Sequence, residues 1–426
     1  MNAASGRKGP LSGVKVLDLA SVIMGPVACQ HLADMGADVI KVEAPEGDLM
    51  RSVGPRKSAD MGAVFLTCNR NKRSVVLDLK QPQAREVLQR LVAGCDVLIH
   101  SVRTAPARKL GLDYAQLREI NPRLVYCHVK GYSDQGAYAG QPAFDDTMQA
   151  ESGLAMLQSV VAGEPRYVPS SIVDKICAIH AAYAVVLALF ERMHSGEGQE
   201  IELPMFETIT AFNLTEHLWG EAFQPPRGAM GYDSVRRGVR KPYPTQDGYI
   251  AFLPYSDLHW HKFFRLVGRA ELVEDPRFAT FPARLKNYDD VFGFVRDTLR
   301  HRTTAEWVQL FADQDIPMAA VNRIEDMLDH PHLESVGFWQ SIEHPTEGML
   351  RMASNPIGLK RTPPSIRRLA PRLGEHTREV LREFEFAPDE VDRLLALGTA
   401  RQWPGDATTA PEPAARSVDS TTATAT

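Results

Sequence analysis

The sequence lacks the features that mark several common classes of protein. It has five cysteines in 426 residues and no CxxC pair, so neither a zinc site nor a redox pair is predicted, and reduced thiols in the cytosol are expected. Its 48 basic residues are outnumbered by 53 acidic ones, and this net charge of -5 argues against a nucleic-acid-binding protein. The amino-terminal segment has no apolar core of a secretion signal. The most apolar run, residues 176–190, is shorter than the roughly 20 residues that a membrane span needs. We therefore expect a cytoplasmic protein that binds neither nucleic acid nor membranes.

Motifs for common cofactors and nucleophiles are also missing. The first predicted strand is followed by one glycine, Gly25, where the dinucleotide fingerprint requires three. No GxxxxGK[ST] phosphate loop and no GxSxG elbow occurs. The histidine pairs at residues 259/261 and 330/332 have no third ligand at a suitable spacing, so no metal site is predicted.

The first 130 residues alternate between short β-branched runs and amphipathic helical patterns. The predicted strands are residues 14–19, 38–43, 74–79, 96–101 and 124–129, and the predicted helices between them are residues 26–35, 83–93 and 114–120. This alternation is typical of βαβ units and predicts a doubly wound α/β domain with a parallel sheet.

The rest of the chain predicts a second domain and a return. Helices are expected at residues 144–157, 172–193 and 205–223, and the second of these is apolar on nearly every face, which predicts a buried central helix. The Pro- and Gly-rich segment 224–231 is the sharpest break. The predicted organisation is a large Rossmann-like domain over residues 10–224, a linker with a Gly-rich loop at 225–234, a small α+β domain at 235–335, a return to the large domain at 336–400, and a disordered tail at 401–426.

Asp174 is the strongest candidate for chemistry, because it lies where a polar loop enters the long apolar helix. A carboxylate in a first helical turn is often only a favourable contact with the helix dipole, but it can also be a nucleophile aimed into a cleft. Lys130 closes the last amino-terminal strand, where open α/β sheets bind ligands, although a solvated strand end is an equally simple interpretation. Gly228 and Gly231 can form either a plain linker or an oxyanion-binding loop.

Seven motifs in consistent order over residues 10–398 resemble one known family. They are LSGVKVLDL (residues 11–19) with Gly-Pro at 25–26 and LADMGADVIKVE (32–43), NRNKRS (69–74), KGY (130–132), QAxSG (149–153), GEGQ (196–199) and LGEHT (373–377). Together they resemble the family III CoA-transferases, a superfamily that includes formyl-CoA and carnitine CoA-transferases and α-methylacyl-CoA racemases. The chain is most similar to those acting on succinyl-CoA and dicarboxylates.

The resemblance implies a fold, an assembly and a reaction. The fold is a Rossmann-like large domain built from both chain ends plus a small domain, in a ring-shaped subunit that forms an interlocked homodimer. The reaction moves CoA from a donor, here expected to be succinyl-CoA, to a carboxylic, most simply dicarboxylic, acid. Coenzyme A and its thioesters are then substrates, and no tightly bound cofactor is expected.

The family's catalytic aspartate opens the long central helix, and by position it corresponds to Asp174. Its carboxylate would form an aspartyl mixed anhydride and then an aspartyl-CoA thioester. The segment with Gly228 and Gly231 corresponds to the family's mobile glycine-rich loop, which would supply oxyanion donors and exclude water.

Other positions are implied by the same resemblance. The matching CoA contacts are Val102, Arg103, Lys109, Lys130 and Tyr132. Ile23 replaces a glutamine that holds oxalate in formyl-CoA transferases, so an oxalate-specific enzyme is not expected. A cationic run with Arg236, Arg237 and Arg240 is either a solvated loop or a site for the distal carboxylate of a dicarboxylic acid.

Two alternatives remain open at the level of sequence. The racemases of the superfamily need a His–Glu pair opposite the aspartate, and these positions fall at Phe144 and near Lys241, which cannot do that chemistry. A relative that binds acyl-CoA without turnover is the other alternative, and the presence of Asp174 argues against it.

Overall fold

The computed structural model describes residues 9–236, 238 and 241–405. It contains two compact units, of which the first comprises Met1–Pro142, Asp174–Pro204 and Gln340–Thr426 and the second Ala143–Val173 and Met205–Trp339. This division differs from the predicted domains, because residues 143–173 and 205–224 belong to the second unit. Most of the predicted tail, residues 406–426, lies outside the described residues.

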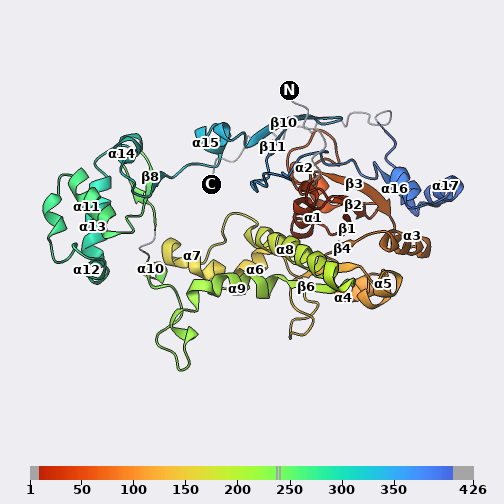
Figure 1. Cartoon of the computed structure of the whole chain (residues 1–426), viewed down its shortest axis with the longest axis horizontal. Coiled ribbons are helices and arrows are strands. Elements are labelled where there is room, and N and C mark those ends of the chain that lie inside the picture. Colours follow the sequence, from red (N-terminus) through yellow and green to blue (C-terminus); the bar gives the residue numbers. More distant parts are fainter. Residues whose placement is uncertain (1–8, 237, 239–240, 406–426) are drawn as a thin grey trace, which may run out of the picture. The chain divides into compact units, whose positions relative to one another are not determined.

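Within the described residues, seven strands form the main sheet of the first unit (Figure 1). They are β1 (Lys15–Leu19), β2 (Asp38–Glu43), β3 (Lys72–Leu77), β4 (Val97–His100), β5 (Val125–Lys130), β6 (Glu200–Pro204) and β12 (Ala400–Arg401). Their order is β12-β3-β2-β1-β4-β5-β6, and all pairs are parallel except β12 with β3. The predicted doubly wound α/β fold is confirmed. The direction in which successive strands are added to the sheet reverses between β1 and β4.

Helices pack on this sheet and bring the carboxyl-terminal part of the chain back to it. They are α1 (Met24–Asp34), α2 (Ala63–Cys68), α3 (Pro82–Ala93), α4 (Thr104–Lys109), α5 (Tyr114–Ile120), α16 (Thr377–Glu383) and α17 (Pro388–Ala396). One hydrophobic cluster joins strand residues such as Leu17 and Val75 to Leu88 of α3 and to Val380 and Val391 of the last helices. Residues from both ends of the chain therefore share this core.

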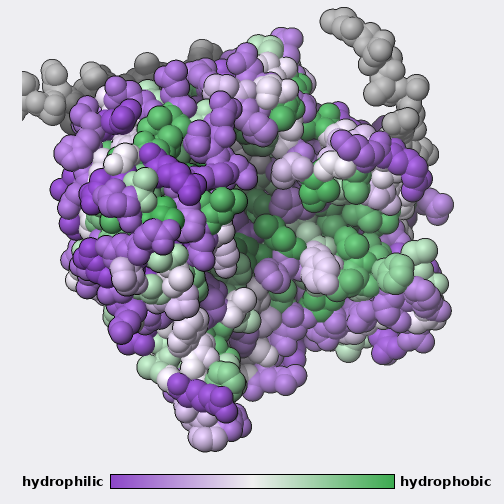
Figure 2. Space-filling model, turned by 60° about the vertical axis from the view of Figure 1, so that its left-hand side comes forward, coloured by the Kyte–Doolittle hydropathy of each residue, from purple (hydrophilic) through white to green (hydrophobic). Residues whose placement is uncertain are grey.

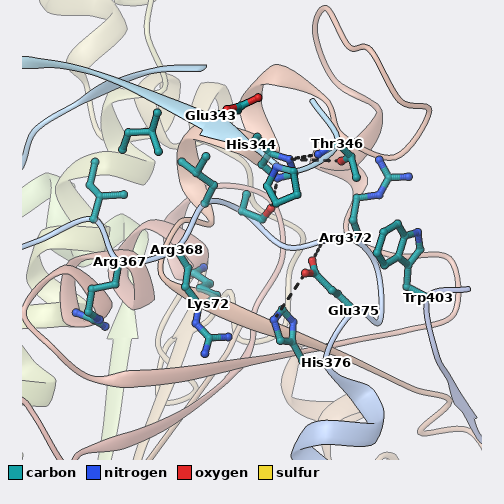
Figure 3. A pocket seen from close by; sticks show the side chains of 15 residues that line it. Lys72, Glu343, His344, Thr346, Arg367, Arg368, Arg372, Glu375, His376 and Trp403 are labelled. Atoms are coloured by element: carbon teal, nitrogen blue, oxygen red, sulfur yellow. Dashed lines mark hydrogen bonds and ion pairs between the residues drawn. The ribbon is translucent and has the colours of Figure 1, made fainter. Parts of the chain in front are cut away.

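The LGEHT motif fixes the returning chain to β3. The Gly374 N–H donates to Ser74 Oγ at 2.9 Å, and the His376 N–H donates to the Ser74 carbonyl at 2.9 Å. The Ser74 N–H in turn lies 3.3 Å from His376 Nδ1. A cavity of about 390 Å³ lies beside this junction (Figure 3). His344 of the following hairpin and Trp403 also line it. The hairpin is formed by β10 (Trp339–His344) and β11 (Gly348–Ala353).

The long helix α8 (Ile172–Ser195) confirms the predicted helix but not its complete burial. Val173, Cys177, Ala181, Val185 and Ala188 are buried. Other apolar side chains of α8 are exposed: Ile179, Tyr183, Val186, Leu187, Phe190 and Met193. Among the described residues, this one helix has the length and composition of a membrane span, and 44% of its most apolar window is buried. By itself that is weak evidence for a membrane.

The second unit is mainly helical. Its helices and short 3₁₀ turns are α6 (Asp145–Glu151), α7 (Leu154–Ala162), α9 (Met205–His217), η2 (Trp219–Ala222), α10 (Asp233–Arg236), α11 (Asp257–Leu266), η3 (Ala270–Val273), α12 (Phe281–Lys286), α13 (Tyr288–Leu299), α14 (Thr304–Phe311), η4 (Glu325–Leu328) and α15 (Pro331–Ser335). Its small antiparallel sheet contains β7 (Tyr243–Pro244), β8 (Tyr249–Phe252) and β9 (Met318–Ala320). The helix predicted at residues 144–157 is two helices, because Gly153 adopts a left-handed conformation with φ 82° between them.

Candidate functional site

The orientation of α8 places Asp174 near one edge of the main sheet. At the other end of the helix, Arg192 donates to the Asp96 carboxylate and to the Arg123 carbonyl, each at 2.8 Å. Asp96 and Arg123 lie just before β4 and β5, so this end of α8 is at the amino edge of the sheet. At about 1.5 Å per residue the helix extends roughly 27 Å back to Asp174, farther than the ~20 Å length of a six-residue strand. Asp174 is buried in the first turn of α8, towards the carboxyl edge.

A cavity of about 290 Å³ opens at this same carboxyl edge. It spans the carboxyl ends of four neighbouring strands. It is lined by residues 19–21 at the end of β1, 41–44 and 46–48 at and after the end of β2, 77–80 at the end of β3, and Val102, Leu110 and Leu112 after β4. The cavity therefore crosses the point where the strand order reverses between β1 and β4. This is where open α/β sheets bind their ligands.

The turn after β1 that lines the cavity is held by buried charges. Asp18 Oδ1 accepts from the Ala20 N–H at 3.0 Å, Lys41 Nζ donates to the Ala20 carbonyl at 2.8 Å, and Asp48 Oδ1 accepts from the Val22 N–H at 3.2 Å. Val22 has φ 71°, a left-handed conformation that is costly for a β-branched residue. Three polar contacts, two on Ala20 and one on Val22, thus hold a strained turn in place.

Asp18, Lys41 and the neighbouring Glu43 are kept ionised by their partners. Burial alone would raise the pKa of Asp18, but Lys41 and Lys72 outweigh it and lower that pKa. Burial would lower the pKa of Lys41, and Asp18 and Asp48 instead raise it. Glu43 is held in the same way, since the effect of burial is overcome by Arg51, whose guanidinium lies 2.7 Å away, and its pKa is lowered. Lys41, Glu43 and Asp48 from these pairs line the cavity.

Lys80 is a cavity residue that sequence reasoning missed. It follows β3 and is exposed, and its ammonium group has no ion pair within the described part of the chain. Lys41, the other lysine of the cavity, is fully buried and bound to Asp48 at 2.9 Å. Lys80 is therefore the cation available to a ligand. Its position directly after the strand predicted at residues 74–79 was the signal, the same one that singled out Lys130.

The predicted residues after β4 lie along one wall of the cavity. Val102 lines it directly, and its carbonyl accepts from His128 Nε2 at 2.8 Å. Arg103 caps the amino end of α4 and Lys109 ends that helix, and both are exposed. Val102, Arg103 and Lys109 thus belong to a single segment that flanks the cavity.

Lys130 and Tyr132 are more enclosed than the sequence suggested. The Lys130 ammonium lies 2.7 Å from Asp134 and 3.2 Å from Glu202. Asp134 also accepts from Thr104 Oγ1 of α4 at 3.0 Å, which links Lys130 to the cavity wall. Tyr132 is buried against Tyr138, with ring centroids 5.5 Å apart. An ammonium group has three donors, and the two carboxylates account for two of those of Lys130.

The predicted loop residues belong to the second unit, and their position relative to Asp174 stays a prediction. The Gly231 N–H donates to the His217 carbonyl at 2.8 Å. Gly228 lies so close to Gly220 that a Cβ on Gly220 would be 2.3 Å from the Gly228 carbonyl oxygen. Arg236 is exposed at the end of α10. Arg237 and Arg240 lie outside the described residues.

The described residues offer neither a metal site nor the proton-transfer pair of a racemase. No group of three or more His, Cys, Asp or Glu side chains there is placed to hold a metal ion. Phe144, at the position of the racemase histidine, is an exposed apolar side chain that precedes α6. It offers no group for proton transfer, so the isomerase alternative is not favoured.

Comparison with known proteins identifies the family. CoA-transferase family III matches residues 11–377, and the chain therefore belongs to this family. A succinate–glutarate CoA-transferase from Agrobacterium fabrum is 32% identical over 386 residues, which cover 89% of this chain and 96% of the relative. The human succinyl-CoA:glutarate CoA-transferase is 26% identical, over 92% of this chain and 90% of the relative.

Solved structures agree with this assignment. A CAIB/BAIF family protein from Brucella suis has a TM-score of 0.76 and 29% identity, covering 89% of this chain and 100% of the other. A Mycobacterium tuberculosis protein has a TM-score of 0.77 and 29% identity, covering 88% and 99%. The resemblance stated from the motifs is thereby confirmed, and the protein is an enzyme that transfers CoA.

Proposed function

We propose that this family III enzyme transfers CoA from succinyl-CoA to a second dicarboxylic acid, with Asp174 as the covalent nucleophile. The relatives named as succinate–glutarate and succinyl-CoA:glutarate CoA-transferases support the substrate class. The observation that carries the proposal is the common location of two features. A buried carboxylate in the first turn of α8 and a cavity with an available lysine both lie towards the carboxyl edge of one sheet.

The proposed chemistry begins with attack of the Asp174 carboxylate on the thioester carbonyl of succinyl-CoA. The C–S bond breaks, leaving a mixed anhydride and CoA thiolate. The thiolate attacks the Asp174 carbonyl of the anhydride, which releases succinate and leaves an aspartyl-CoA thioester. The acceptor carboxylate then displaces CoA to form a second anhydride, and the thiolate attacks its acceptor carbonyl, which regenerates Asp174. Each intermediate keeps an acyl group activated, so no ATP is consumed.

The cavity after β1–β4 is the proposed site for the nucleotide end of CoA. Lys80 supplies a cation for a phosphate group, and Arg103 and Lys109 add two more along the wall formed by α4. Lys130 contributes its remaining donor. The acidic neighbours of the cavity, such as Glu46, are hydrogen-bond acceptors for ribose hydroxyl or adenine amino groups.

The remaining roles are proposed from the family resemblance. The Gly228 N–H has no hydrogen-bond partner among the described residues, so it is the candidate oxyanion donor of the glycine-rich loop, whereas the Gly231 N–H is already used. Arg236, with Arg237 and Arg240, would bind the distal carboxylate of a dicarboxylic substrate. These assignments place recognition of the acid substrate in the second unit, whereas the proposed CoA site is in the first.

The enzyme is proposed to act as a homodimer of interlocked ring-shaped subunits. An exposed apolar stripe on α8, from Ile179 to Met193, supports a protein partner, since a stripe of this kind is costly in water. Hydrophobic side chains also gather at the surface on the face shown in Figure 2. The occupant expected from the family is a second copy of the chain.

The test is an assay of succinyl-CoA against a panel of mono- and dicarboxylic acids, with mass-spectrometric detection of new acyl-CoA thioesters. Wild type should form thioesters of dicarboxylic acids, and Asp174→Ala should form none while still binding CoA. Asp389→Asn is the matched control, because Asp389 is also in a first helical turn of the first unit. Equal loss in both variants, or turnover by Asp174→Ala, would contradict the assignment of the nucleophile. Hydrogen exchange of the acyl α-carbon in deuterated water without acceptor acid would instead indicate an isomerase.

A further inference from the structure

Three buried polar aromatic side chains stand side by side behind the cavity wall. His100 ends β4, and Tyr126 and His128 lie two residues apart on β5, so they face the same side of the sheet. His100 and His128 are direct partners in the β4–β5 register, and their rings stack with centroids 4.1 Å apart. Each of the three residues is at most 3% exposed.

Two of these side chains are hydrogen-bonded to backbone carbonyls at the two ends of segment 102–112. His128 Nε2 lies 2.8 Å from the Val102 carbonyl, and Tyr126 Oη lies 2.6 Å from the Leu112 carbonyl. A carbonyl only accepts, so both side chains donate. The Tyr126 oxygen is then the acceptor for His100 Nε2, 2.6 Å away, so His100 donates to Tyr126 and Tyr126 donates to the Leu112 carbonyl.

The two carbonyls delimit the wall of the cavity. Val102 and Leu112 both line it, and between them lie α4 and the cationic residues Arg103 and Lys109. His128 and Tyr126 therefore attach both ends of segment 102–112 to the sheet. These hydrogen bonds are directional, so they fix where the two ends of the segment lie.

We propose that His128 and Tyr126, with His100 supporting Tyr126, are positioning residues that hold segment 102–112 in the conformation that binds CoA. The inference rests on the proposed nucleotide site in this cavity. None of the three side chains lines the cavity itself. Their effect is on affinity for the CoA moiety, because a wall that is free to move must be ordered again each time CoA binds.

Burial of the imidazoles supports this role. The pKa of His128 is lowered to about 4, chiefly by burial and also by the nearby Lys130, and these effects outweigh the bond to Val102 and the carboxylates of Asp134 and Glu202, which act in the opposite direction. His128 is thus neutral at physiological pH, which leaves the Nε2–H donor in place without a buried charge.

The experiment measures steady-state kinetics with succinyl-CoA and an accepted dicarboxylic acid. His128→Leu removes the donor and His128→Gln keeps an N–H donor. We expect His128→Leu to raise KM for succinyl-CoA about tenfold, with kcat within about twofold of wild type and KM for the acceptor acid unchanged. His128→Gln should restore much of the affinity, and Tyr126→Phe should resemble His128→Leu.

His344→Leu is the matched control. His344 is also a buried histidine whose Nε2 lies 2.9 Å from a backbone carbonyl, that of Ala370, beside the separate cavity of Figure 3. It should lose stability much as His128→Leu does but keep its KM. An unchanged KM in His128→Leu and Tyr126→Phe would overturn the proposal. If Lys80→Met also leaves KM unchanged, the nucleotide site itself is misplaced, whereas a raised KM in Lys80→Met alone refutes only the positioning role. Tyr126→Phe, which removes a single oxygen, decides the matter if His128→Leu does not fold.

Discussion

Asp174 and Arg192 are both buried on α8 and stand about five helical turns apart at ~3.6 residues per turn, so they share one side of the helix. The bonds of Arg192 to Asp96 and to the Arg123 carbonyl therefore fix the rotation as well as the height of α8 against the sheet. The direction in which Asp174 points is set in part at the far end of its helix.

Removing this anchor should destabilise the first unit. Arg192→Leu removes the donors to Asp96 Oδ1 and to the Arg123 carbonyl, and we expect the free energy of unfolding to fall by about 1–3 kcal/mol. Urea unfolding followed by circular dichroism measures this. Arg118→Leu is the control, because its pair with Glu197 is exposed and 3.3 Å long, and it should cost less than about 1 kcal/mol. Equal losses would show that Arg192 is not an anchor.

Lys80 should contribute to the affinity for CoA and not to the chemical step. Lys80→Met removes the available cation of the cavity, so KM for succinyl-CoA should rise about tenfold, with little change in kcat, as expected for a contact made equally in ground and transition states. Initial rates at saturating acceptor acid give both constants. Lys360→Met, another exposed lysine of the first unit, should behave as wild type. A fall in kcat at constant KM would place Lys80 in the catalytic step instead.

The strands were predictable because short runs with β-branched residues alternate with helical patterns, and β2 (Asp38–Glu43) was predicted with its observed bounds. Asp174 was predictable as a candidate, since a charge at the start of an apolar helix stands out. Other features depend on contacts between distant residues. The left-handed conformation of Val22 is imposed by Asp48, 26 positions away, and the exposure of one side of α8 cannot be read from a helix that is apolar all round.

Gly198, which follows α8, lies too close to neighbouring backbone to carry a side chain. Gly198 packs against Leu124, the residue that precedes β5, and a Cβ on Gly198 would be 2.1 Å from the Leu124 carbonyl oxygen. Gly198→Ala must therefore displace backbone, and we expect a loss of more than about 2 kcal/mol in the free energy of unfolding. Gly293→Ala is the control, because its Cβ would meet its nearest atom at 3.9 Å within α13, and it should gain up to about 1 kcal/mol. An unchanged stability in Gly198→Ala would mean that the strand can shift at no cost.

The apolar stripe of α8 should control assembly. Wild type is expected to be a dimer by size-exclusion chromatography with light scattering. The double variant Tyr183→Asp/Phe190→Asp should be monomeric, because burying two unpaired carboxylates in an interface is strongly unfavourable. Ile324→Asp, which changes an apolar side chain that is 80% exposed in the second unit, should remain dimeric. A dimeric double variant would exclude this stripe from the interface.

His128 should give stability a specific dependence on pH. Its pKa is lowered to about 4 in the folded chain, from about 6.5 when unfolded. Between these values the unfolded chain binds the proton and the native chain does not, so stability falls as the pH drops from 6.5 towards 4. The loss at pH 4.5 relative to pH 7.5 should be about 2.5 kcal/mol larger in wild type than in His128→Gln, which has no imidazole to protonate. Urea unfolding of both proteins across this range measures the difference and cancels the other titrating groups. Parallel curves would mean that His128 titrates near its ordinary pKa, and that segment 102–112 opens readily enough to hydrate the ring.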